Sequence, residues 1–128
     1  MAIHVLVADD EPHIGRIIQT KLEQGPFRIT LVSDGPAALE ALEEYPDVAL
    51  VLLDVMMPGL TGLEVLARIR ADPRWASLAC VILTAAGHDQ QREEALRLGV
   101  ADFITKPFSP KRLYARVAEL TANAPGVS

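Results

Sequence analysis

Polar side chains that can bind a metal ion or a phosphate stand at the ends of four apolar segments of this sequence. They are Asp9, Asp10 and Glu11 after the first segment, Asp54 after the third, Thr84 at the end of the fourth and Lys106 after the fifth. Ligands of an open parallel sheet bind beyond the carboxyl ends of its strands. If the four segments are neighbouring strands, the carboxylates of Asp9, Asp10 and Asp54 converge with one hydroxyl and one ammonium on one rim.

Such a rim needs a cation. Two carboxylates about 4 Å apart repel each other by roughly 4 kcal/mol at an effective dielectric constant near 20, and Lys106 alone does not balance three acids. Oxygen ligands with water suit Mg²⁺, or Mn²⁺, better than zinc. A hard divalent ion beside a carboxylate nucleophile, a lysine and a hydroxyl suits phosphoryl transfer, because these groups share the charge on the phosphoryl oxygens.

Each of these residues taken alone has an ordinary structural explanation. Asp9 and Asp10 are typical of a solvated strand end or a helix cap, and Asp54 is typical of a turn. Thr84 fits a β-branched strand end, and Lys106 fits a surface lysine. The functional interpretation therefore depends on their combination at four strand ends.

Five apolar segments are predicted to be strands. They are Ile3–Ala8, Phe27–Val32, Val48–Leu53, Ala79–Leu83 and Ala101–Ile104. Three of them are almost continuously apolar, which is typical of central parallel strands covered on both faces. The segment Phe27–Val32 instead alternates between apolar and polar residues, which predicts an edge strand.

Amphipathic helices are predicted between and after these strands. Four apolar stripes recur at three- and four-residue spacings: Ile14, Ile17 and Ile18; Ala38, Leu42 and Tyr45; Val65, Leu66 and Ile69; Leu113, Val117 and Leu120. Thr61 and Glu64 have the spacing of a capping box, and Ser109 before Pro110 indicates another helix start. The stretch Gln90–Leu98 has only a weak stripe, which predicts a lightly packed helix. Five strand–helix repeats predict one α/β domain with a parallel sheet and helices on both faces.

Bulk properties restrict the class of protein. The chain has 128 residues, a net charge of −5 and one cysteine, Cys80. One cysteine excludes an intrachain disulfide, and the negative charge argues against direct nucleic-acid binding. No apolar stretch has the length of a membrane span, and the N-terminus lacks a signal-peptide layout. We therefore expect a cytoplasmic protein with no membrane contact.

Four sequence segments carry a resemblance to a known family. They are Val5–Pro12 (VLVADDEP), Leu53–Gly62 (LDVMMPGLTG), Val81–Ala85 (VILTA) and Phe103–Phe108 (FITKPF). In order and spacing they resemble the response-regulator receiver domains of bacterial two-component systems, the CheY-like superfamily. The resemblance covers residues 3 to about 121 and implies a flavodoxin-like (βα)5 domain with a five-stranded parallel sheet of order 2-1-3-4-5. Residues 1–121 would form the receiver domain, and residues 122–128 a flexible tail or the start of a linker.

The resemblance implies roles for the residues of the rim. Asp54 would attack a phosphohistidine of a sensor histidine kinase or phosphotransfer protein. Mg²⁺, or Mn²⁺, would be bound by Asp10, Asp54 and the backbone carbonyl of Met56, and by Asp9 mainly through water. Lys106 would contact a phosphoryl oxygen. The chain would then be a signalling domain with self-catalysed phosphotransfer and autodephosphorylation, and not an enzyme.

A switch is implied by the same resemblance. Thr84 would donate its hydroxyl to the phosphoryl group, and Phe103 would turn into the space that Thr84 leaves. Phe103 stands where many members have tyrosine, so its position rests on packing without a hydroxyl hydrogen bond. Met56 and Ala86 stand at positions that, in the family, tune how fast water removes the phosphoryl group. The bond from Lys106 to the following proline is expected to be cis.

The output surface is expected to comprise the fourth helix, the fifth strand and the fifth helix, facing an output domain or an effector protein. Members fused to winged-helix domains often dimerise there through crossed salt bridges, and phosphorylation-dependent dimerisation is one alternative here. Asp102 and Arg116 could supply one such pair. Arg112 and Ala101 stand where those members usually carry acids, which argues against that dimer.

Three other functions fit parts of the pattern. A small metal-dependent phosphohydrolase would need its nucleophilic aspartate after the first strand, with a second aspartate two residues on, but Asp9 and Asp10 are adjacent. A flavin- or nucleotide-binding module would need a phosphate-binding loop where the acids stand. A degenerate receiver that only binds proteins would not need the complete set of acids.

Overall fold

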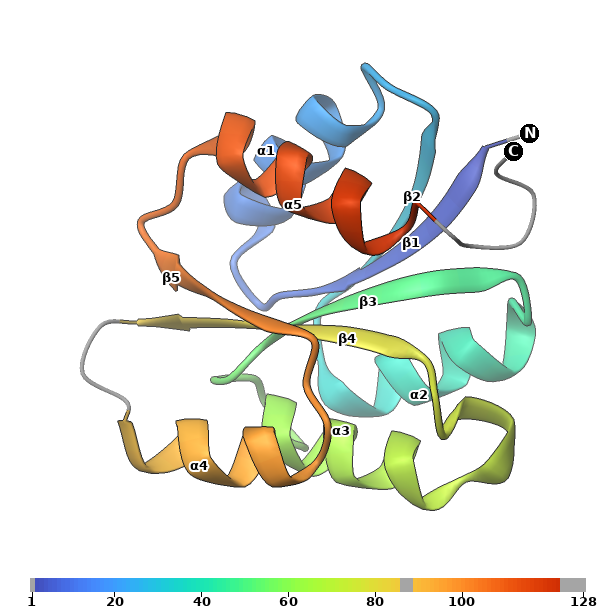
Figure 1. The fold of residues 1–128 in the computed structure, drawn as a ribbon, viewed down its shortest axis with the longest axis vertical. Coiled ribbons are helices and arrows are strands. Elements are labelled where there is room, and N and C mark those ends of the chain that lie inside the picture. Colours follow the sequence, from blue (N-terminus) through green and yellow to red (C-terminus); the bar gives the residue numbers. More distant parts are fainter. Residues whose placement is uncertain (1, 86–88, 123–128) are drawn as a thin grey trace.

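The computed structural model describes residues 2–85 and 89–122 and contains five parallel strands in the order β2-β1-β3-β4-β5 (Figure 1). The strands are β1 (Ile3–Ala8), β2 (Phe27–Val32), β3 (Val48–Asp54), β4 (Ala79–Ala85) and β5 (Asp102–Lys106). The helices are α1 (Pro12–Leu22), α2 (Gly35–Glu44), α3 (Gly62–Ala71), α4 (Asp89–Arg97) and α5 (Pro110–Leu120), with a 3₁₀ helix η1 (Pro73–Trp75) after α3. The expected (βα)5 fold and strand order are confirmed. Ala86 and residues 123–128 of the predicted tail lie outside the described residues.

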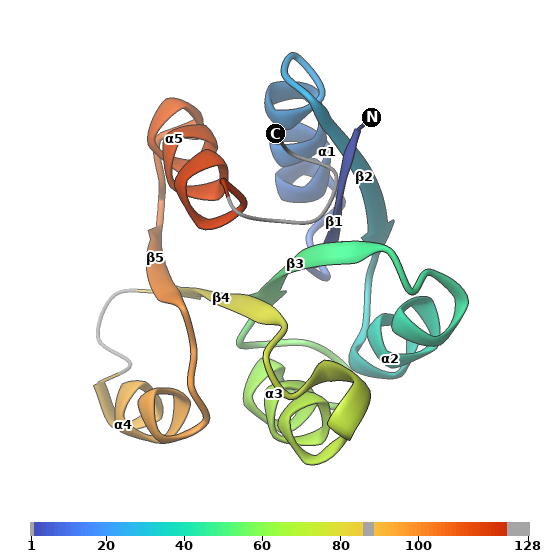
Figure 2. The same ribbon diagram turned by 45° about the vertical axis from the view of Figure 1, so that its right-hand side comes forward.

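The central strands are continuously apolar because they supply two cores. Leu6, Val51, Leu53 and Ile82 pack in the core that includes residues of α2, α3 and α4. Val5, Leu52, Val81 and Leu83 pack in the core that includes residues of α1 and α5. Figure 2 shows these two groups of helices on opposite sides of the sheet. Alternate residues of one strand therefore point into different cores, which leaves no polar face.

The predicted helix starts at Thr61 and Ser109 are confirmed. The Thr61 hydroxyl accepts a hydrogen bond from the backbone N–H of Glu64 at 3.2 Å, and the Glu64 carboxylate accepts one from the N–H of Thr61 at 2.9 Å. Ser109 accepts from the N–H of Arg112 at 3.3 Å. These side chains satisfy N–H groups that have no partner inside the helix.

Helix α1 buries a different face from the one predicted. Ile18 and Leu22 are buried and Ile14 is half-buried, but Ile17 is 43% exposed. Positions 14, 18 and 22 share one face of a helix at four-residue spacing. The prediction that Ile17 belongs to the buried stripe is therefore wrong, because three isoleucines can mark two adjacent faces and spacing alone does not choose between them.

Helix α4 is lightly packed, as its sequence predicts. Among the described side chains of α4 only Ala95 is buried, and Leu96 is 59% exposed. Arg70 of α3 donates hydrogen bonds to the carbonyl oxygens of Leu98 at 2.7 Å and Gly99 at 3.1 Å. The C-terminal end of α4 is thus held by a side chain of α3, whereas the described part of the helix itself contributes little to the core.

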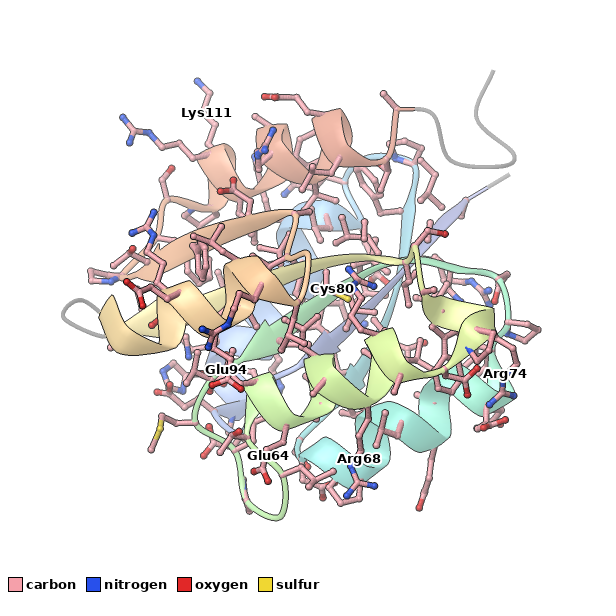
Figure 3. All side chains as sticks on the ribbon, turned by 60° about the horizontal axis from the view of Figure 1, so that its bottom comes forward. Glu64, Arg68, Arg74, Cys80, Glu94 and Lys111 are labelled. Carbon is pink, nitrogen blue, oxygen red and sulfur yellow. The ribbon has the colours of Figure 1, made fainter. Side chains whose placement is uncertain are left out.

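The single cysteine is a core residue. Cys80 is buried in the core between the sheet and the helices α2, α3 and α4. Glu64, Arg68 and Glu94 project outward from that side of the molecule (Figure 3). Burial raises the pKa of the Cys80 thiol to about 11, so it stays protonated and unreactive at neutral pH. Within the described residues, no helix is long and apolar enough to cross a membrane.

Candidate functional site

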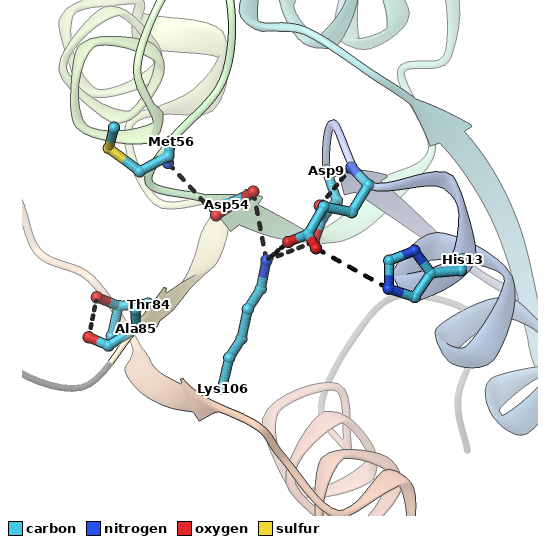
Figure 4. A network of polar contacts seen from close by, with 8 residues as sticks. Asp9, His13, Asp54, Met56, Thr84, Ala85 and Lys106 are labelled. Carbon is cyan, nitrogen blue, oxygen red and sulfur yellow. Dashed lines mark hydrogen bonds and ion pairs between the residues drawn. The ribbon is translucent and has the colours of Figure 1, made fainter.

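The acidic residues of the first and third strands meet at the carboxyl edge of the sheet. Strands β1 and β3 are neighbours in which Ala8 pairs with Leu53, so the residues that follow, Asp9 and Asp54, lie side by side. Strand β5 carries Lys106 at its last position, two strands away from β3. Its long side chain reaches back across the edge toward both acids (Figure 4). Strand order therefore brings together residues far apart in the sequence.

Lys106 is the centre of this cluster. Its Nζ lies 3.0 Å from Oδ2 of Asp9, 3.1 Å from Oε1 of Glu11 and 3.3 Å from Oδ2 of Asp54. The side chains of Asp9 and Asp54 are only 1% and 7% exposed, and that of Lys106 is 17% exposed. One ammonium thus faces three carboxylates, two of them nearly removed from water, and the charge is not balanced by these residues alone.

The imbalance appears in the protonation of Asp54. Burial and the nearby charge of Asp9 raise the pKa of Asp54 to about 7, although Lys106 and the backbone N–H of Met56 act in the opposite direction. Burial alone would lower the pKa of Lys106, but the neighbouring carboxylates outweigh burial, and its pKa is raised above the ordinary value. Lys106 therefore stays charged at neutral pH, while Asp54 keeps its proton to a much higher pH than an ordinary aspartate does.

The donor set fits a hard divalent cation. Oxygen atoms of Asp9, Asp10, Glu11 and Asp54 lie within 4.8 Å of one another. Oδ1 of Asp9 accepts from the backbone N–H of Glu11 at 2.9 Å. Oδ2 of Asp9 is buried and receives no well-aligned hydrogen bond from the described residues. Lys106 nevertheless lies within ion-pair distance of this oxygen. A buried carboxylate oxygen with spare acceptor capacity, among other carboxylates, suits Mg²⁺ or Mn²⁺.

Three other predicted residues, Thr84, Met56 and Phe103, stand outside the ion-pair network. The Thr84 hydroxyl donates to the carbonyl oxygen of Ala85 at 3.1 Å (Figure 4). Met56 has an exposed side chain, and its backbone N–H donates to Oδ1 of Asp54 at 3.3 Å. Phe103 is half-buried on β5. The peptide bond from Lys106 to Pro107 is cis, as expected.

Glu11 belongs to the cluster, although the sequence placed it at the rim without assigning it a role of its own. Its carboxylate contacts Lys106 at 3.1 Å and lies 3.9 Å from the ring of His13 on the outer side. Glu11 also stands at the N-cap of α1, but its side chain makes no capping hydrogen bond. Its position directly after Asp9-Asp10 was the signal for a role in the cluster. An acid at the start of a helix is also explained by the helix dipole, so this signal alone did not indicate a contact with Lys106.

The chain is similar in sequence to known proteins. The family model of the response regulator receiver domain matches residues 5–118. The phosphate regulon transcriptional regulatory protein PhoB of Escherichia coli K12 is 38% identical over 118 residues, which are 91% of this chain and 51% of PhoB. The response regulator PleD of Caulobacter vibrioides is 37% identical over 122 residues, which are 94% of this chain and 26% of PleD. The chain thus spans about half of one curated relative and about a quarter of the other.

A solved structure shows the same likeness. The receiver domain of the Francisella response regulator 1452 is 33% identical and superposes with a TM-score of 0.81. The match covers 92% of this chain and 95% of that domain. Sequence and fold therefore agree on the same family.

Proposed function

The chain belongs to the response regulator receiver domain family of two-component systems, and from this premise we propose that Asp54 is its phosphoryl acceptor. The observation that carries the proposal is the position of the Asp54 carboxylate. It ends β3 at the open edge of the sheet, 3.3 Å from the ammonium of Lys106 and beside three further acids. In this family the donor is the phosphohistidine of a sensor histidine kinase or phosphotransfer protein, and we assign that class of partner to this chain.

The transfer exchanges one bond to phosphorus for another. An oxygen of the Asp54 carboxylate attacks the phosphorus, the bond from phosphorus to the histidine nitrogen breaks, and the imidazole keeps the electron pair and takes a proton from solvent. Lys106 faces the developing charge on a phosphoryl oxygen, and its raised pKa keeps it cationic. Hydrolysis of the resulting acyl phosphate by water returns Asp54, so the domain would act as a timed signal and not as an enzyme with a separate substrate.

Asp10, Asp54 and the carbonyl of Met56 would hold Mg²⁺, or Mn²⁺, with Asp9 acting through a water molecule. When bound, the ion supplies positive charge that neutralises the carboxylates and shares the charge of the phosphoryl oxygens. Asp54 has a pKa of about 7 beside Asp9. Positive charge at this rim favours the ionised carboxylate, which is the nucleophilic form.

Thr84 and Phe103 would couple the acceptor to the output surface. In the sheet, Ile82 pairs with Phe103 and Thr84 pairs with Thr105. Side chains alternate along strands, so Thr84 and Phe103 project from the same face of neighbouring strands, the face that α4 covers. A Thr84 hydroxyl that turned from Ala85 to a phosphoryl group would leave space on this face, and the ring of Phe103 would turn into it.

The output partner would contact α4, β5 and α5. Asp102 and Arg116 form an ion pair of 2.6 Å inside the chain. The pair suggested for crossed salt bridges between two copies is thus already satisfied, which favours an output domain or effector protein over that dimer.

A kinase of a two-component system would meet this domain in the cytoplasm.

We expect acetyl phosphate with Mg²⁺ to phosphorylate Asp54 alone. Borohydride reduction of the acyl phosphate followed by peptide mass spectrometry should label Asp54 in the wild type and nothing in Asp54→Asn. Asp34→Asn, which changes a helix-capping aspartate outside the cluster, is the control and should be labelled like the wild type. Undiminished label in Asp54→Asn would refute the assignment. An unlabelled wild type would indicate a degenerate receiver, and steady turnover of a small phosphate ester would indicate a phosphohydrolase.

We expect Mg²⁺ to stabilise the fold through Asp10 more than through Asp9. A free concentration tenfold above the Kd adds about 1.4 kcal/mol to the free energy of unfolding, which raises the Tm by roughly 5 °C. Asp10→Asn should lose most of this increment because it removes a direct ligand, while Asp9→Asn should keep more of it. Thermal melts of each variant with EDTA and with Mg²⁺ give the increments. Equal increments in Asp10→Asn and the wild type would contradict the assignment of Asp10.

A further inference from the structure

One contact on the output side lies outside the phosphoryl chemistry and involves the switch residue. The guanidinium carbon of Arg92 in α4 lies 4.8 Å from the centre of the Phe103 ring in β5. Arg92 is exposed and Phe103 is half-buried. Among the described residues no carboxylate lies within ion-pair distance of Arg92, so the aromatic ring is its described partner. A guanidinium within 6 Å of an aromatic centre is attracted by the negative face of the ring.

The two residues connect a lightly packed helix with an edge strand. Strand β5 is an edge of the sheet, and α4 lies on the face that α3 also covers, beside that edge (Figures 1 and 2). The described part of α4 buries only Ala95, and Arg70 fixes its C-terminal end. Arg92 stands in the first half of α4, away from that fixed end. Its contact with Phe103 therefore links the less restrained part of α4 to β5.

We propose that Arg92 is a positioning residue that holds Phe103 in the half-buried orientation it has here, against an inward turn, and so opposes the active state. The inference rests on the proposed function, because it needs the inward turn of Phe103 that follows the movement of Thr84. Phe103 has no hydroxyl with which to hold a position by hydrogen bonding, and the guanidinium supplies a directional attraction in its place. When the ring turns inward, it leaves Arg92 and the attraction is lost. The contact thus exists in one state only, and a contact with that property shifts the equilibrium between the states.

The size of the bias follows from the exposure of the contact. A cation–π contact at an exposed site changes a two-state equilibrium by about two- to fivefold. If the active state is the minor one, the apparent Kd of a ligand that binds only that state falls by the factor by which its population rises. Removing the guanidinium should therefore make the domain easier to activate, without any change at the acceptor site itself.

Beryllium fluoride with saturating Mg²⁺ is the probe, because it mimics the phosphoryl group on Asp54 without covalent chemistry. The readout is ¹⁹F NMR of protein labelled with 4-fluorophenylalanine, which replaces Phe27, Phe103 and Phe108. A Phe103→Leu sample identifies the signal of Phe103. We expect Arg92→Gln to lower the beryllium fluoride midpoint about two- to fivefold relative to the wild type, and Arg92→Lys to lie between them, since a cation remains above the ring.

Arg97→Gln is the matched control. It removes the same charge from the same helix, and Arg97 contacts no aromatic ring among the described residues, so its midpoint should equal that of the wild type. A midpoint in Arg92→Gln that is unchanged or higher overturns the inference, and so does an equal fall in Arg97→Gln. If beryllium fluoride leaves the Phe103 signal of the wild type unmoved, the switch of the proposed function is wrong and this inference falls with it. If that signal moves while Arg92→Gln titrates like the wild type, only the role of Arg92 is wrong.

Discussion

The Asp54→Asn variant is expected to be more stable than the wild type by roughly 2–4 kcal/mol at pH 8 without divalent metal. The Asp54 side chain is 7% exposed and lies beside the buried carboxylate of Asp9, with Lys106 shared among three acids. An ionised Asp54 therefore costs free energy in the folded state that an amide of the same size does not. The phosphoryl acceptor would thus be destabilised in the resting, metal-free domain, and the sensitivity of the site to cations has the same origin.

The pH dependence of this difference has a definite sign. Folding raises the pKa of Asp54 from 3.8 to about 7, so between these values the folded chain holds a proton that the unfolded chain has released. The contribution of Asp54 to stability is greatest at low pH and falls as the pH rises from about 4 to 7. Urea unfolding in EDTA should show a gap between Asp54→Asn and the wild type that shrinks to about 1 kcal/mol or less at pH 4.5 and is complete at pH 8.

Glu40→Gln is the control for this experiment, because Glu40 is an exposed acid of α2 and its loss changes the net charge equally. Its stability should follow the wild type across the same pH range. If Asp54→Asn and the wild type have the same stability at pH 8, the carboxylates of the rim do not repel each other as their distances imply.

Most of the fold could be predicted from the sequence because strands and helices place their apolar residues differently: strands in continuous or alternating segments, and helices at three- and four-residue spacings. Continuous apolar segments marked the strands that face two cores, and the alternating segment marked the edge strand β2. The order of the strands came from the family resemblance, since apolar segments carry no information about which of them are neighbours. The error at Ile17 has a related cause: a spacing defines a face only when the packing partner is known.

The rim was predicted less completely than the fold. Asp9, Asp54 and Lys106 were expected together and lie together, because strand ends of known order fix their positions. The orientation of the Thr84 hydroxyl toward Ala85 could not be predicted, because a rotamer at an exposed strand end depends on local partners. The contact of Arg92 with Phe103 joins a helix to an edge strand, and no spacing in the sequence encodes it.

Lys106→Met is expected to have the opposite effect from Asp54→Asn and to lower the free energy of unfolding by roughly 3–5 kcal/mol at pH 8 without metal. Methionine has a similar length and no charge, so Asp9 and Asp54 remain buried with no cation beside them. The pKa of Lys106 is raised, so the wild-type lysine is fully charged at pH 8. The stability that its charge contributes is lost only as the pH rises through this raised pKa. Lys111→Met, which removes an exposed lysine of α5 (Figure 3), is the control and should cost little.

The double variant Lys106→Met/Asp54→Asn decides whether charge or packing causes this loss. If the loss comes from uncompensated carboxylates, removing Asp54 from the cluster should restore much of the stability, and the two substitutions should be strongly non-additive. Lowering the pH to 5 should also reduce the loss in Lys106→Met, since Asp54, with a pKa of about 7 even beside Lys106, is then protonated. Urea unfolding of the four variants of this cycle at pH 5 and pH 8 in EDTA measures both effects. A loss in Lys106→Met that is the same at both pH values and additive with Asp54→Asn would mean that the lysine stem stabilises the fold by packing, and that its charge does not hold the acids of the rim together.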